Sequence, residues 1–186
     1  MRKFIEGLPK SYFNYPMPVT VVGIQKGETR NLIPLVWHVQ LSFDPPLYGV
    51  SISPKRFSHN LLLEAGEFSV NFLPFEMVPL IARLGSVSGR EVDKIKEFNV
   101  QVEPARKIDG FILKDAYVSF ECQLIEHTAF QGDHTFFVGL VVATHYDTEF
   151  FDENTVIDVK AVKPALYIGK YRYLTVDPES LKDTSK

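Results

Sequence analysis

The sequence predicts a mainly β fold, with a barrel core of antiparallel strands into which two or three helices are inserted. Several runs alternate apolar and polar residues with the period of a half-buried strand, whereas helical spacing is confined to short segments. The 15 Phe and 8 Tyr suit a β-rich core. Hydrophobic and charged contents of 45% and 23% are typical of a globular protein, so 186 residues predict one domain spanning the chain, 1–186.

The first third of the chain reads as strands joined by tight turns. Residues 19–24 are a β-branched run, and Lys26-Gly27-Glu28 is typical of a hairpin turn. Residues 31–39 are apolar but interrupted by Pro34, which indicates an irregular or edge segment because proline cannot donate to a central strand. Residues 44–46, Asp-Pro-Pro, predict a stiff turn.

A strand, a basic turn and a helix follow in close succession. Residues 50–53 alternate as a strand that ends at Pro54, and residues 68–72 predict the next strand. Between them, Ser58 stands in the position of a helix N-cap and Gly66 in that of the C-terminal stop. The candidate binding site described below is predicted from this stretch.

The remainder of the chain alternates a few helical segments with longer strands. A helix is expected at 77–84, followed by a glycine- and serine-rich loop at 85–90 and a charged segment at 91–97. The last residues, about 176–186, form a polar tail that is expected to fray. Strands are expected at 100–102, 112–113, 116–127, 135–146, 166–169 and 171–174.

Composition narrows the classes of function. The net charge of −3 gives no basic footprint for nucleic acid. The single cysteine, Cys122, excludes an intramolecular disulfide and fits a reducing cytoplasm. The N-terminus lacks the apolar stretch of a secretory signal, and the longest apolar run, 136–143, is too short to span a bilayer. We therefore expect a cytoplasmic protein without a membrane segment.

The turn between the strand ending at Pro54 and the helix is a candidate anion site. Free backbone N–H groups and the positive end of the helix dipole favour an anion there, and Lys55 and Arg56 add full charges. The alternative is that Ser58 only caps the helix while both cations are solvated. The stretch alone leaves the two interpretations equally supported.

Several familiar catalytic and metal-binding motifs are absent from the sequence. There is no dinucleotide fingerprint, phosphate loop or serine elbow, and the five histidines lack metal-ligand spacing, so no metal site is predicted. Cys122 lies in the middle of a strand, where a buried inert thiol is the favoured interpretation. The loop from Ser86 to Lys94 and the pair Asp133-His134 are polar clusters that, taken singly, favour ordinary structural roles.

Taken together, these segments resemble the flavin reductase-like, FMN-binding split-barrel family over about residues 15–173. Each motif is modest, but their number and order make the resemblance strong. The residues that carry it are Asn31-x-x-Pro34-x-x-Trp37, Asp44-Pro45-Pro46, Ser51-Ile52-Ser53 with Arg56 and Ser58, Phe68-Ser69-Val70-Asn71, Gly85-x-x-Ser88-Gly89-Arg90-x-x-Asp93-Lys94, Glu121-Cys122, Gly132-Asp133-His134-Thr135, Gly139 and Tyr167-Ile168-Gly169-Lys170-Tyr171.

The resemblance implies a Greek-key split β-barrel that forms a homodimer, with FMN near the subunit interface. By position, it implies that Ser51, Ile52, Ser53, Arg56 and Ser58 hold the phosphate and ribityl chain. The isoalloxazine would be bordered by Asn31, Leu32, Ile33 and Pro34, with Asn71 supporting the first strand pair. Further along the chain, Ser88, Arg90 and Lys94 would close over the phosphate, and the catalytic candidate His134 would face the reactive side of the flavin.

The activity implied is that of an FMN-dependent oxidoreductase, in which NAD(P)H as a transient co-substrate passes hydride to flavin N5 and a small molecule or redox protein accepts the electrons. The alternatives are a non-catalytic FMN carrier or electron shuttle, and a cofactor-free interaction domain. One departure from the family pattern is His38-Val39-Gln40-Leu41 after Trp37, where small or hydroxyl residues are more familiar. This departure leaves the substrate preference open.

Overall fold

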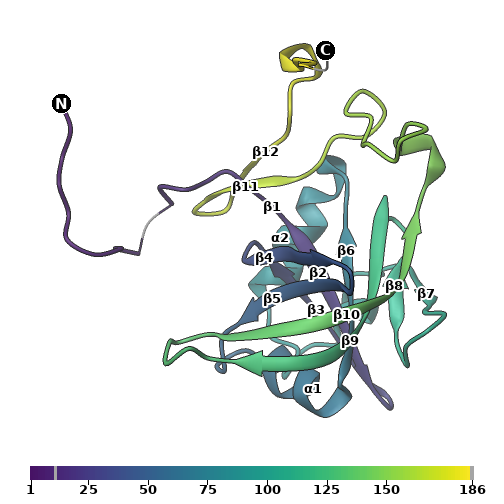
Figure 1. Ribbon diagram of the computed structural model, residues 1–186. Helices are drawn as coiled ribbons and strands as arrows, with labels where there is room; N and C mark the ends of the chain where they lie inside the picture. The colour runs from purple at the N-terminus through teal and green to yellow at the C-terminus, as the bar shows by residue number, and fades with distance from the viewer. Residues whose placement is uncertain (11, 185–186) are drawn as a thin grey trace.

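The computed structural model describes residues 1–10 and 12–184, which are built mainly from antiparallel β-strands (Figure 1). Seven strands form the main sheet in the order β3-β2-β6-β9-β10-β5-β4. They are β2 (Thr20–Lys26), β3 (Thr29–Leu35), β4 (His38–Phe43), β5 (Pro46–Ile52), β6 (Glu67–Phe72), β9 (Val118–Thr128) and β10 (Thr135–Tyr146). The predicted fold class, a mainly β fold of antiparallel strands with inserted helices, is confirmed.

Two small sheets flank the main one. In the first, β11 (Leu166–Gly169) pairs with both β1 (Met17–Pro18) and β12 (Arg172–Leu174), so it joins the two ends of the chain. In the second, β7 (Val102–Pro104) pairs with β8 (Phe111–Leu113). Figure 1 shows the N-terminal segment running away from the body of the molecule.

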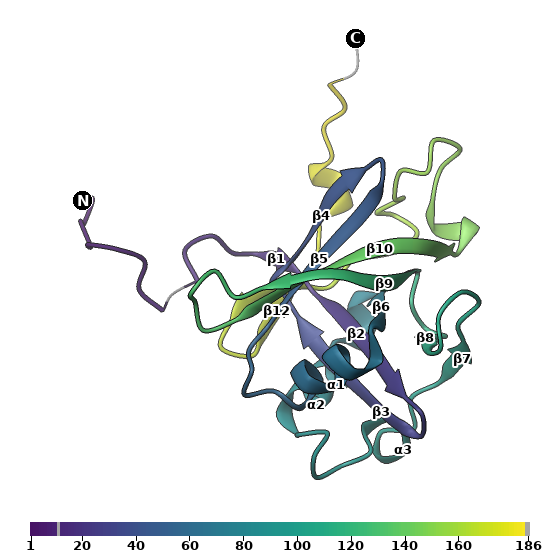
Figure 2. The ribbon, with the colours of Figure 1, turned by 60° about the horizontal axis from the view of Figure 1, so that its bottom comes forward.

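The helices are short and lie beside β2 and β3 of the main sheet (Figure 2). The first packs against β2, β3 and β6, and the next two contact β3. They are α1 (Phe57–Ala65), α2 (Val78–Ser86) and α3 (Lys94–Glu97), with 3-10 turns at Phe75–Met77, Thr148–Phe150 and Pro178–Ser180. No helix within residues 1–10 and 12–184 has the length and apolar character that a membrane crossing requires.

The sheet is apolar on both faces because two hydrophobic clusters lie on opposite sides of β2. Val21 belongs to the cluster under α2 and α3, whereas its neighbour Val22 belongs to the cluster inside the barrel. Successive side chains of a strand point to opposite faces, so β2 is buried along most of its length and its sequence does not alternate. Phe68 and Phe137 fill the barrel interior and are almost fully buried.

Several local predictions are confirmed by the backbone. Pro34 lies in β3, an edge strand of the main sheet. Proline has no backbone N–H, and an edge strand tolerates this because one of its sides pairs with no other strand. Gly66 ends α1 in the left-handed conformation at φ 69°, with its N–H donated to the Leu62 carbonyl. Fraying of the polar tail is not among the confirmed predictions, because residues 178–180 form a 3-10 turn and residues 185–186 lie outside the described residues.

The predicted N-cap at Ser58 is wrong. The helix begins at Phe57, two residues before the start that a cap at Ser58 implies, and Arg56 is the capping residue, without a side-chain cap bond. The Ser58 hydroxyl lies inside the first turn and accepts a hydrogen bond from Asn31 Nδ2 at 2.7 Å. A tertiary partner on β3 therefore uses the oxygen that a local cap would have used.

Candidate functional site

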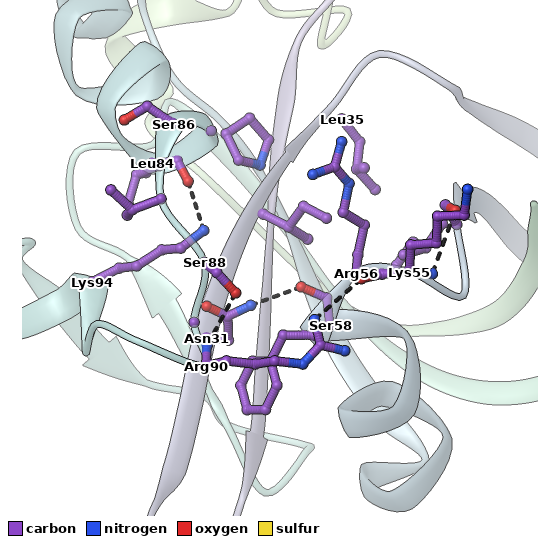
Figure 3. Close-up of a pocket in the computed structure, with 18 of the residues that line it drawn as sticks. Asn31, Leu35, Lys55, Arg56, Ser58, Leu84, Ser86, Ser88, Arg90 and Lys94 are labelled. Carbon is purple, nitrogen blue, oxygen red and sulfur yellow. Dashed lines mark hydrogen bonds between the residues drawn. The ribbon is translucent and has the colours of Figure 1, made fainter.

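A cavity of about 720 Å³ opens where β3, β5, the start of α1 and the loop after α2 come together (Figure 3). Most of the predicted cofactor-site residues and the catalytic candidate His134 line it, although they come from separate segments of the chain. These are Asn31, Ile33, Pro34, Ser51, Ile52, Ser53, Arg56, Ser58, Ser88, Arg90, Lys94 and His134.

Positive charge is concentrated at one end of this cavity, where the lining residues Lys55, Arg56, Arg90 and Lys94 meet the N-terminus of α1. The first turn of α1 holds no acidic residue that would neutralise the positive end of the helix. Glu91 is the one carboxylate among the lining residues, so this end is net positive in a chain of net charge −3.

Arg90 bridges the two loops that border the cationic end. Its guanidinium donates to the Lys55 carbonyl at 3.2 Å and lies over the Phe57 ring, 5.9 Å from the centroid. The Ser88 hydroxyl accepts from the Arg90 backbone N–H at 3.2 Å, which holds the loop after α2 in a turn. The loop and the helix start are thereby fixed relative to one another.

Lys94 is a buried cation with no carboxylate partner among the described residues. Its Nζ donates to the carbonyls of Leu84 at 2.6 Å and Leu32 at 2.8 Å (Figure 3 shows the first). Burial, with a smaller contribution from the nearby Arg56 charge, lowers the pKa of Lys94 to about 8. An ammonium has three donors, so one remains for a further acceptor.

Asn31 carries the one buried side-chain polar atom without a hydrogen-bond partner in residues 1–10 and 12–184. The side chain is 2% exposed, and Oδ1 has no partner while Nδ2 is bound to Ser58. Gly89 lies against this oxygen so closely that a Cβ there would overlap it. A buried acceptor left unpaired is costly, so a donor from a ligand in the cavity would stabilise this arrangement.

The mouth of the cavity is aromatic. Tyr15, Trp37 and His134 all line it, and the Trp37 and His134 rings lie 4.8 Å apart between centroids. His134 Nδ1 is 2.7 Å from Asp133 Oδ1, and this hydrogen bond holds the pKa of Asp133 below its ordinary value.

Two predicted site residues do not reach the cavity. The Leu32 side chain is fully buried in the cluster under α2, and only its carbonyl meets the site, through Lys94. Asn71 is also fully buried; it donates to the Val21 carbonyl at 2.9 Å and accepts from the Leu113 N–H at 3.0 Å. It supports the strands, as the resemblance implied, but takes no place in the cavity lining.

Tyr15 and Phe57 are among the lining residues that sequence reasoning missed. Tyr15 lies in a proline-rich lead-in that gave no signal, and Phe57 reads as an ordinary core residue at a helix start. His38, whose role was left open, faces away from the cavity: its ring nitrogens meet Tyr48 Oη at 2.7 Å and the Pro18 carbonyl at 3.1 Å.

Comparison with known proteins identifies the family. The family described as "flavin reductase like domain" matches residues 12–175. The chain belongs to the flavin reductase-like family. Its fold is the split barrel of that family, which confirms the predicted resemblance.

Three similar proteins show how far the likeness extends. An FMN-binding protein from Thermus thermophilus, solved with bound 1-cyclohex-2-enone, is 41% identical with a TM-score of 0.88, covering 98% of this chain and 100% of that one. Flavoredoxin from Methanosarcina acetivorans is 29% identical with a TM-score of 0.82, covering 95% and 92%. An NADH-dependent FMN reductase from Streptomyces nodosus subsp. asukaensis is 32% identical over 130 residues, which are 70% of this chain and 69% of the relative.

Proposed function

We propose that this flavin reductase-like protein is an FMN-binding oxidoreductase, acting as an NAD(P)H-dependent flavin reductase or in flavoredoxin-like electron transfer. The observation that carries the proposal is the cationic end of the cavity, formed by Lys55, Arg56, Arg90 and Lys94 beside the α1 N-terminus. A phosphate close to a dianion fits such a site. The FMN-binding protein and the FMN reductase among its relatives support the same ligand.

The cavity residues fit FMN in three ways. Arg56 and Lys94 would hold the phosphate, since one is a fork-shaped donor and the other keeps a free N–H. Asn31 Oδ1 would accept from a hydroxyl or N–H of the flavin. Gly89, which has no side chain, lets the loop after α2 approach Asn31 at a point where a Cβ would overlap Oδ1.

FMN, when bound, supplies the redox chemistry, with NAD(P)H as hydride donor and a small molecule or redox protein as acceptor. The protein's own residues bind and orient the partners. His134 lies at the mouth, where its Nε2 can form a hydrogen bond to the substrate while Asp133 holds the ring through Nδ1. The single buried thiol, Cys122, is consistent with the cytoplasmic location that we include in the proposal.

An FMN carrier or electron shuttle without its own NAD(P)H reaction is the second candidate. The likeness to flavoredoxin at 29% identity favours it. Rapid mixing of the FMN-loaded protein with NADH or NADPH separates the two. Bleaching of the flavin absorbance within the mixing experiment supports the reductase, and an unchanged spectrum supports the shuttle.

Arg56 provides the test of the phosphate site. We expect Arg56→Ala to weaken FMN binding by roughly 10- to 150-fold, because a charge-assisted bidentate contact contributes about 1.5–3 kcal/mol. Arg56→Lys should recover part of the loss, since an ammonium keeps the charge without the fork. Riboflavin is the matched control ligand, because it lacks the phosphate. Dissociation constants that rise equally for FMN and riboflavin would contradict the proposal.

We also propose that the protein is a homodimer. The edge strand β4 exposes apolar side chains at alternate positions, with Val39 47%, Leu41 44% and Phe43 86% exposed. An edge strand with such a row is suited to pairing with a second copy of the same surface. Light scattering at micromolar concentration should give twice the 21.2 kDa of the chain. A mass of one chain would reject the dimer, and Leu41→Lys should lower the measured mass if β4 forms the interface.

A further inference from the structure

Residues 1–10 form an arm that leaves the body of the molecule, which we define as residues 12–175. Figures 1 and 2 both show the arm running away from the sheets. Within the described residues, the arm forms no hydrogen bond with the body. Its large apolar side chains are exposed to water, with Phe4 and Leu8 each 90% and Ile5 54% exposed. Three such side chains in one short segment carry a hydration cost that burial against another surface would remove.

The arm departs from a fixed base beside the mouth of the cavity. The Tyr12 ring packs edge to face against Tyr15 at 5.1 Å and lies 6.2 Å from Tyr167 on β11. Gly169 lies so close to the Tyr12 ring that a Cβ would overlap it. Tyr15 Oη in turn accepts the indole N–H of Trp37 at 3.2 Å. The chain is therefore held at residues 12–15, and the exposed apolar side chains of the arm lie beyond this base.

The apolar residues of the arm are spaced as on one face of a helix. Met1, Phe4, Ile5 and Leu8 follow the pattern i, i+3, i+4 and i+7, and Pro9 would end a helix at this point. In the single chain the arm is not helical. A segment that is irregular alone but amphipathic at helical spacing is typical of a peptide that folds as it docks on an apolar surface.

The charge and the length of the arm fit a second copy of the same chain. The arm carries Arg2, Lys3 and Lys10 against Glu6 alone, whereas the whole chain has a net charge of −3, so the body is more negative than the whole. A positive arm is attracted to a negative body. Ten extended residues span about 33 Å. This is roughly twice the radius of gyration, about 16 Å, of a compact chain of this size.

We infer that residues 1–8 are a docking arm for a second copy of this chain, whose body buries the apolar face formed by Phe4, Ile5 and Leu8. The inference rests on the proposed homodimer and goes beyond it, because pairing through β4 requires no arm. In a closed two-fold dimer each protomer gives one arm and receives one, so the two arms clasp the dimer from both sides.

The rate of subunit exchange measures what the arm contributes to the dimer. Unlabelled and ¹⁵N-labelled full-length protein are mixed, and native mass spectrometry follows the appearance of mixed dimers. The double variant Phe4→Ser with Leu8→Ser should exchange at least about 10-fold faster than the wild type, because two buried apolar contacts are lost. The control is Val156→Ser with Leu181→Ser, which removes side chains that are 59% and 68% exposed outside the arm and should exchange at the wild-type rate.

Photo-crosslinking identifies the surface on which the arm docks. With p-benzoylphenylalanine in place of Phe4, irradiation should give a covalent product of twice the 21.2 kDa of the chain, in which the arm is joined to a peptide from the body of the other copy. A product of one chain, with the arm joined to its own body, would overturn the inference. So would binding of the wild type, but not of the Phe4→Ser and Leu8→Ser variant, to vesicles of phosphatidylcholine and phosphatidylglycerol without any crosslinked dimer, because the arm would then dock on a lipid surface.

The inference, the homodimer and the proposed function fail in different ways. A wild type that has the mass of one chain rejects the homodimer and the arm together. A dimer that exchanges at the same rate in the wild type and in the arm variant rejects the arm alone. Failure of the proposed function appears as absent FMN binding, which none of these measurements requires.

Discussion

At the scale of single residues, Lys94 differs from the lysines of a charged surface patch because its ammonium is buried. Burial favours the neutral amine, so the buried ammonium destabilises the fold below pH 8, and this cost is relieved as the pH rises from about 8 towards the ordinary value of 10.5. The two carbonyls that surround Nζ compensate in part and fix its position. A bound anion would favour the charged form and so raise the pKa of Lys94.

Lys94 therefore predicts the pH dependence of FMN binding. The phosphate remains a dianion above pH 7, so the affinity should fall by roughly 10-fold as the pH rises from 7 to 9.5 and the ammonium loses its proton. Fluorescence titration of FMN at both pH values measures this change. Lys94→Met should bind FMN weakly at both, whereas Lys55→Met should keep the pH dependence. If the FMN affinity of Lys94→Met fell by the same factor as that of the wild type between the two pH values, the pH dependence would come from another group.

At the scale of elements, much of the fold follows from local signals. Proline is tolerated at an edge strand, and glycine adopts the positive φ that the end of a helix and the turn at Gly27 require; the structure contains all three. The predicted cap at Ser58 is wrong because the Ser58 hydroxyl accepts from Asn31, which is 27 residues away in sequence, and not from a backbone N–H of its own helix. Most of the site residues implied by the resemblance line the cavity, yet nothing in the sequence indicated Tyr15, whose contact with Trp37 depends on the path of the terminal segments.

Glu121 on β9 is a second case of a contact that only the tertiary structure reveals. The carboxylate is fully buried and accepts the backbone N–H groups of Arg106 at 2.8 Å, Lys107 at 2.6 Å and Ile108 at 3.2 Å, together with His145. Burial alone raises its pKa, but the N–H groups and His145 outweigh this and lower it. This one side chain thus holds three successive N–H groups of the loop before β8 against the sheet.

We expect Glu121→Gln to lower the free energy of unfolding by about 3 kcal/mol, because the new amide N–H₂ would face backbone N–H donors. Urea denaturation at pH 7 measures the loss. Glu67→Gln is the control: Glu67 accepts the N–H of Asp109 from the same loop but is only half-buried, so its loss should be below about 1 kcal/mol. Because Glu121 does not line the cavity, the FMN affinity of Glu121→Gln should equal that of the wild type. If both variants lost a similar free energy of unfolding, Glu121 would contribute no more to stability than Glu67.

At the scale of the whole molecule, His38 joins the terminal sheet to the barrel. It lies on β4, contacts Tyr48 on β5 and reaches the carbonyl of Pro18 on β1. A carbonyl only accepts, so Nε2 carries the hydrogen and Nδ1 accepts from the Tyr48 hydroxyl in the neutral ring. Burial lowers the pKa of His38, although the hydrogen bond to Pro18 opposes this. The sequence marked His38 as unusual for the flavin site, whereas the structure gives it a role in holding the chain ends.

The lowered pKa of His38 predicts that the folded protein loses stability in mild acid. The folded pKa lies below the unfolded value of 6.5, so below that pH the unfolded chain binds more protons and the free energy of unfolding falls. Above it, both states are neutral and the contribution is constant. Urea denaturation between pH 5.5 and 7.5 should show this fall in the wild type and a smaller one in His38→Gln, which does not titrate. His127→Gln, which removes an exposed histidine, should behave as the wild type does. Equal slopes in all three proteins would show that His38 is not the group responsible.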